Sequence, residues 1–82
     1  MNTILRPLTA IEEFSVLRRA PFLLPFLLAQ GLCLDDALPI AHNATLLSCC
    51  IDKEISPRRV LESYSLKEIA DLCHSYYEEA GM

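Results

Sequence analysis

The side chains best suited to chemistry in this sequence are four cysteines and two histidines: Cys33, Cys49, Cys50, Cys73, His42 and His74. A structural zinc site usually takes its ligands from spaced pairs such as Cys-x-x-Cys. Here Cys49 and Cys50 are adjacent, as are Cys73 and His74, and adjacent residues on a helix point about 100° apart. Such pairs cannot readily hold one ion. We therefore expect no metal or other cofactor, and we expect Cys49 or Cys50, together with Cys73, to fill core volume.

The sequence does not indicate catalysis either. A nucleophilic cysteine needs a histidine within reach and a third group that orients the histidine. Cys73 and His74 would diverge on one helix, and the sequence leaves open whether His42 approaches a thiol. Gly31 and Gly81 are the only glycines, so there is no glycine-rich phosphate loop. We predict a protein that is not an enzyme, with no small-molecule substrate and no catalytic residues.

Net charge and cysteine content indicate which class of partner and which cellular compartment to expect. The formal net charge is −4, and the arginine pairs Arg18–Arg19 and Arg58–Arg59 are isolated from each other. A nucleic-acid-binding face normally carries a basic stripe, so we expect no nucleic-acid partner. The first residues lack the layout of a secretory signal peptide. We therefore expect a cytoplasmic protein whose cysteines remain thiols.

The apolar stretch over residues 20–34 raises the question of a membrane span. A spanning helix needs about 20 consecutive apolar residues. This stretch is shorter, is interrupted by Pro25, Gln30 and Gly31, and is followed by two aspartates. We expect a buried helix here and no membrane span.

Helix-start signals divide the chain into helices. Thr9 with Glu12 and Ser65 with Glu68 each have the spacing of a capping box. Ser56 followed by proline has the pattern of an N-cap and first helical residue. Leucine and alanine are abundant and glycine is scarce, which favours helix over sheet. These features predict an all-α fold, a compact bundle of four to five short helices forming one domain over residues 1–82.

The predicted helices have approximate limits set by these signals and by prolines and glycines. Asp36 is the expected N-cap of the third helix. The expected ranges are 10 to about 20, 22–30, 37–51, 57–63 and 66–80.

The periodicity of apolar residues predicts which side of each helix faces the core. The expected core-facing sets are Ile11, Phe14, Val16 and Leu17 in the first helix, Ile40, Ala41, Ala44, Leu47 and Ile51 in the third, and Leu66, Ile69, Ala70, Cys73, Tyr76 or Tyr77, and Ala80 in the last. We expect Thr45 at the edge or back of the third helix.

The densest apolar segment is a candidate binding surface. Six large apolar residues occur within residues 22–28, and a short helix in so small a domain cannot easily bury every side. The alternative, left open by the sequence, is that this helix is the central core helix. Tyr76 and Tyr77 are adjacent, so one of them should face the core, and the other is either a surface tyrosine or an interface anchor. The candidate protein-interface residues are Phe22, Leu23, Phe26, Leu27, Tyr76 and Tyr77.

The order of these motifs resembles the small helical tail assembly chaperones of tailed phages and prophages. The resembling segments are Leu8-Thr9-Ala10-x-Glu12, Leu17-Arg18-Arg19, Asn43-Ala44 with Leu46-Leu47, Ser56-Pro57-x-x-Val60-Leu61-Glu62, Tyr64-Ser65-Leu66-x-Glu68-Ile69 and Tyr76-Tyr77. The resemblance implies a non-enzymatic protein in the host cytoplasm that coats the tape-measure protein and recruits tail-tube subunits.

Two other functions fit the same sequence. A small inhibitor or adaptor that binds a host protein would also be short, acidic and cytoplasmic, and genome neighbourhood would separate it from a tail chaperone. A membrane-surface protein using residues 22–28 would partition into lipid vesicles. In each protein-binding case the partner is another protein or a further copy of the chain, so we expect an oligomer or a complex.

Overall fold

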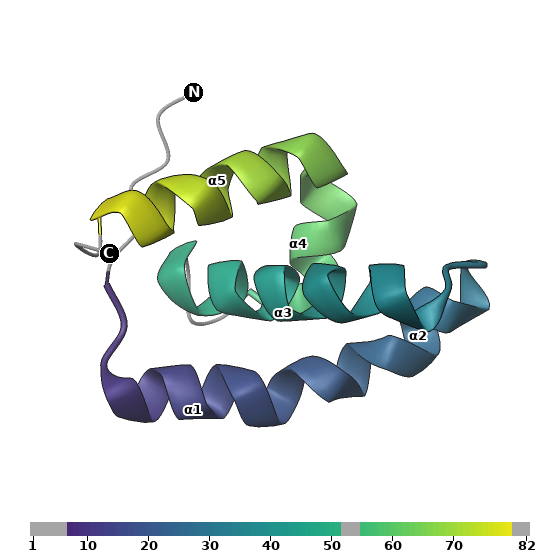
Figure 1. Ribbon diagram of the computed structural model, residues 1–82, viewed down its shortest axis with the longest axis horizontal. Helices are drawn as coiled ribbons and strands as arrows, with labels where there is room; N and C mark the ends of the chain where they lie inside the picture. Colours follow the sequence, from purple (N-terminus) through teal and green to yellow (C-terminus); the bar gives the residue numbers. More distant parts are fainter. Residues whose placement is uncertain (1–6, 52–54, 80–82) are drawn as a thin grey trace.

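The computed structural model describes residues 7–51 and 55–79, and these form an all-α bundle with no strand in the described residues (Figure 1). The fold class predicted from the sequence is thus confirmed. The elements are α1 (Ala10–Arg19), the 3-10 helix η1 (Ala20–Leu23), α2 (Leu24–Ala29), α3 (Leu34–Ile51), α4 (Pro57–Ser63) and α5 (Leu66–Glu79).

Helix α3 is the centre of the bundle. It packs against α1, η1, α2, α4 and α5, and Figure 1 shows α1 and α5 on opposite sides of it. Small residues permit this close packing, because Ala37, Ala41 and Ala44 are fully buried at helix–helix contacts. Leu47 is also fully buried, with no exposed surface. The central helix is therefore α3 and not the apolar segment over residues 22–28.

The buried side of α3 is wider than predicted. Thr45 was expected at the edge or back, yet it is completely buried. Its hydroxyl donates a hydrogen bond of 2.8 Å to the carbonyl of Ala41, and the Ser48 hydroxyl donates one of 2.7 Å to the carbonyl of Thr45. These bonds satisfy both hydroxyl donors within the helix itself, so the two residues can face the core.

Three of the four predicted caps, those at Thr9, Ser56 and Ser65, are confirmed. Thr9 forms a capping box with Glu12, and Ser65 forms one with Glu68, with the backbone N–H of each serine or threonine donating to the glutamate. The Ser56 hydroxyl accepts a hydrogen bond from the backbone N–H of Arg59, and α4 then runs over the predicted residues.

The start of α3 differs from the prediction. The helix begins at Leu34, which places Asp36 at its third position and Pro39 inside the helix. Asp36 accepts a hydrogen bond of 3.2 Å from the Cys33 thiol. An acidic residue is stabilised by the helix dipole anywhere in the first turn, so its presence does not distinguish the cap from the turn that follows.

The predicted second helix is divided in two. Residues 20–23 form η1, and the α-helical turns of α2 begin only at Leu24, with Pro25 in the first turn. Gly31 has a φ of 95°, the left-handed conformation expected of a residue that follows a helix end.

Helix α5 buries only part of its predicted apolar set. Ile69, Cys73 and Tyr76 face the core, whereas Leu66 and Ala70 are exposed. Leu66 is the first helical residue and lies at one end of the helix. Ala80 and Gly81 lie outside the described residues.

None of the helices within residues 7–51 and 55–79 has the length and apolar character needed to cross a membrane.

Candidate functional site

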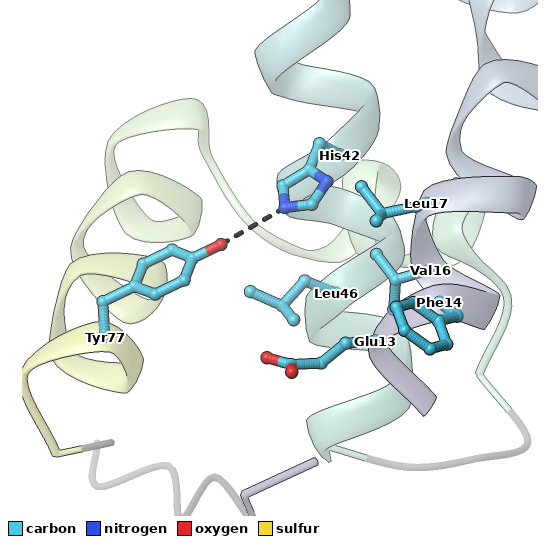
Figure 2. Close-up of a pocket in the computed structure, with 7 residues that line it drawn as sticks. All are labelled: Glu13, Phe14, Val16, Leu17, His42, Leu46 and Tyr77. Carbon is cyan, nitrogen blue, oxygen red and sulfur yellow. Dashed lines mark hydrogen bonds between the residues drawn. The ribbon is translucent and has the colours of Figure 1, made fainter. Parts of the chain in front are cut away.

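A groove with an apolar floor lies between α1 and α5, and α3 forms its bottom (Figure 2). We call it the α1–α5 groove. Its volume is about 280 Å³. The residues that line it are Glu13, Phe14, Val16 and Leu17 from α1, His42 and Leu46 from α3, and Tyr77 from α5.

The α1 wall of the groove continues into an exposed apolar surface. Val16 is buried against the bundle, but Ile11, Phe14 and Leu17 are 76%, 60% and 59% exposed. These three residues are spaced three apart and therefore form a stripe along one side of the helix. We call this stripe the α1 ridge. Because Phe14 and Leu17 also line the groove, the ridge and the groove form one continuous surface.

The exposure of the α1 ridge corrects the predicted core-facing side of α1. At about 100° per residue, Phe14 points roughly opposite to Val16, and Leu17 lies roughly at right angles to it. Val16 and Ala20, four residues apart, are the buried pair instead. The sequence therefore contains two apolar stripes on this helix, and only one of them packs on α3.

The opposite wall of the groove is held in place by a hydrogen bond. The Tyr77 hydroxyl lies 3.2 Å from Nε2 of His42, and the imidazole tautomer decides which group donates (Figure 2). Burial raises the pKa of Tyr77, and the nearby Cys73 thiol raises it further. The Tyr77 hydroxyl therefore remains protonated at neutral pH. Glu13 extends from α1 towards this side of the groove. The site thus combines an apolar floor with three polar side chains, those of Glu13, His42 and Tyr77.

The predicted interface residues are divided between core and surface. Leu23, Leu27 and Tyr76 are buried within the chain, so a partner cannot contact them without unfolding. The Tyr76 hydroxyl accepts a hydrogen bond of 3.2 Å from the backbone N–H of Leu8. These three residues are therefore reassigned to the core.

The other three predicted interface residues remain at the surface to different degrees. Phe22 is 82% exposed, and Tyr77 forms one wall of the groove. Phe26 is half-buried, with the guanidinium carbon of Arg58 lying 4.5 Å from the centre of its ring. A cation above the ring covers one face of Phe26 and ties α4 to α2.

The structure also includes site residues that the sequence prediction missed. The sequence predicts that the ridge residues face the core, and it raises His42 as a possible metal ligand or partner for a thiol, not as part of a binding surface. The spacing of three between Ile11, Phe14 and Leu17 places these residues on one stripe, but the same spacing is typical of a core-facing stripe, so it does not identify them as exposed.

The cysteines form no reactive centre within the described residues. None of the four cysteines forms a disulfide within the described residues; Cys33 is exposed, and Cys50 and Cys73 are buried. Burial, followed by the proximity of Cys50, raises the pKa of Cys73 to about 12, which disfavours the nucleophilic thiolate. No group of three or more potential metal ligands is assembled in residues 7–51 and 55–79.

Comparison of the chain with protein-family models, with curated proteins and with solved structures finds no match. The features that point to a function are therefore the α1 ridge and the groove.

Proposed function

We propose that this chain is a non-enzymatic protein-binding module whose docking surface consists of the α1 ridge and the α1–α5 groove. The observation that carries the proposal is the exposure of three large apolar side chains along one side of α1, next to an open groove. Burying a side chain of this size is worth about 1.5–3 kcal/mol, so covering the three provides a substantial driving force for association.

The shape of the surface favours a helical segment as the ligand. Two helices wall the groove and a third supports it, which is the arrangement that receives the apolar side of an amphipathic helix. Glu13, His42 and Tyr77 supply polar groups that can orient such a segment. Buried Val16 and Leu46 give the groove a firm floor, because both are fixed by the packing of α1 on α3.

The resemblance to phage tail assembly chaperones provides candidate partners. For a protein of that kind, the ligand would be a helical segment of the tape-measure protein, and tail-tube subunits would be recruited to the same complex in the host cytoplasm.

The proposal predicts that Leu17→Glu weakens capture of the partner by roughly tenfold or more, since loss of one buried leucine contact exceeds 1.4 kcal/mol. A matched control is Leu66→Glu, because Leu66 is 57% exposed, close to the 59% of Leu17, but lies at the start of α5 away from the groove. Tagged wild-type and variant chains would be used to capture proteins from the native host, and each captured protein would be quantified by mass spectrometry.

The expected result is a specific partner retained by wild type and Leu66→Glu and lost by Leu17→Glu, with unchanged helical circular dichroism in all three. Equal capture by the two variants would show that the α1 surface is not the docking site.

A further inference from the structure

We propose that a second copy of this chain covers the α1 ridge, with the two α1 helices packed antiparallel about a two-fold axis. This inference depends on the proposed function, because it assumes that the α1 surface is a protein interface.

The spacing of the ridge makes it self-complementary. Phe14 lies midway between Ile11 and Leu17, and all three are exposed. Reversing one helix about Phe14 places Ile11 against Leu17 of the second copy, and Phe14 against its own counterpart. An interface with two-fold symmetry requires that the same patch match itself in this way.

The charges of α1 select the antiparallel orientation. Glu12 and Glu13 occupy its first turn, and Arg18 and Arg19 occupy its last turn. Antiparallel packing places the acidic end of each helix beside the basic end of the other, and it also pairs the opposite ends of the two helix dipoles. Parallel packing would place like charges together. Such charges mainly determine orientation and specificity.

The size of the surface indicates a weak dimer. A helix of ten residues is about 15 Å long. Two such helices bury less than the roughly 1,600 Å² of a standard stable interface. We therefore expect a dissociation constant on the order of micromolar or weaker, so that another protein can displace the second copy.

The first test measures mass by sedimentation equilibrium over a series of protein concentrations. The wild-type mass should rise from 9.2 kDa towards twice that value. Leu17→Glu should remain monomeric, and Leu66→Glu should behave as wild type. A dimer that persists unchanged in Leu17→Glu would overturn the inference, because the second copy would then use another face.

The second test reverses charges. One variant carries Arg18→Glu and Arg19→Glu, and the other carries Glu13→Arg. Each alone should associate at least several-fold more weakly than wild type, because like charges face each other. An equimolar mixture should form a heterodimer more tightly than either variant associates with itself. If the two variants bind each other no more tightly than each binds itself, antiparallel pairing is wrong.

The outcomes separate this inference from the proposed function. A wild-type chain that stays monomeric at all concentrations, while Leu17→Glu still loses its captured partner, overturns self-pairing and leaves the α1 surface as a site for another protein. If Leu17→Glu affects neither mass nor capture, both proposals fail.

Discussion

Leu47→Ala is expected to lower the free energy of unfolding by about 2–5 kcal/mol, the range found when a fully buried leucine is truncated. Leu47 has no exposed surface and lies on α3, the helix against which every other element packs. A cavity at this position would weaken several helix contacts together. For a domain of this size the loss is a large fraction of the total stability.

Urea denaturation followed by circular dichroism would measure this effect. Leu38→Ala is the matched control, because Leu38 lies on the same helix but is 47% exposed. It should change stability by only about 0.5 kcal/mol or less, as is usual for surface positions. Similar small losses in both variants would contradict the central position of α3.

Raising the pH above about 9 should weaken the fold, because Cys73 must keep its proton in the folded chain. Burial, and after it the proximity of Cys50, raises the pKa of Cys73 from 9.0 to about 12. In the unfolded chain the thiol loses its proton near the ordinary pKa, so the unfolded state then binds fewer protons than the folded state. The free energy of unfolding should fall between pH 9 and 12, by at most about 1.4 kcal/mol per pH unit, and this group should contribute no pH dependence below that window.

Urea denaturation at a series of pH values from neutral to strongly alkaline would measure this slope. Cys73→Val removes the titrating proton while keeping an apolar side chain, so its slope above pH 9 should be shallower. A residual slope is expected from Tyr77, whose pKa is also raised. An unchanged slope in Cys73→Val would show that another group causes the alkaline loss.

Helix limits could be predicted from the sequence wherever they depend on local chemistry. The capping boxes at Thr9 and Ser65, and the N-cap at Ser56, satisfy backbone donors within three residues, so no knowledge of the tertiary structure is needed. The start of α3 was predicted less well, because Asp36 is equally suited to the cap and to the first turn.

The side of a helix that faces the core could not be predicted with the same success. Helix α1 has two apolar stripes, and only packing on α3 determines that Val16 is buried while Phe14 is exposed. Thr45 can be buried because its hydroxyl donates a hydrogen bond within its own helix. The polarity of the side chain alone does not predict this burial.

The candidate site depends on contacts between residues far apart in the chain. A high density of apolar residues makes residues 22–28 a candidate surface, but this density does not separate buried Leu23 and Leu27 from exposed Phe22. The groove joins α1, α3 and α5, and the hydrogen bond between His42 and Tyr77 crosses 35 positions. No local pattern in the sequence indicates such a pairing.

Site-specific photo-crosslinking can show directly whether α1 lies against another polypeptide. A photoreactive phenylalanine analogue would be placed at Phe14 of the α1 ridge in one variant and at Leu66 in a control, and each would be irradiated in cells. We predict a covalent adduct from position 14, to a second copy or to another protein, and little from position 66. No adduct from position 14, or equal yields from the two positions, would contradict the assignment of α1 as the binding surface.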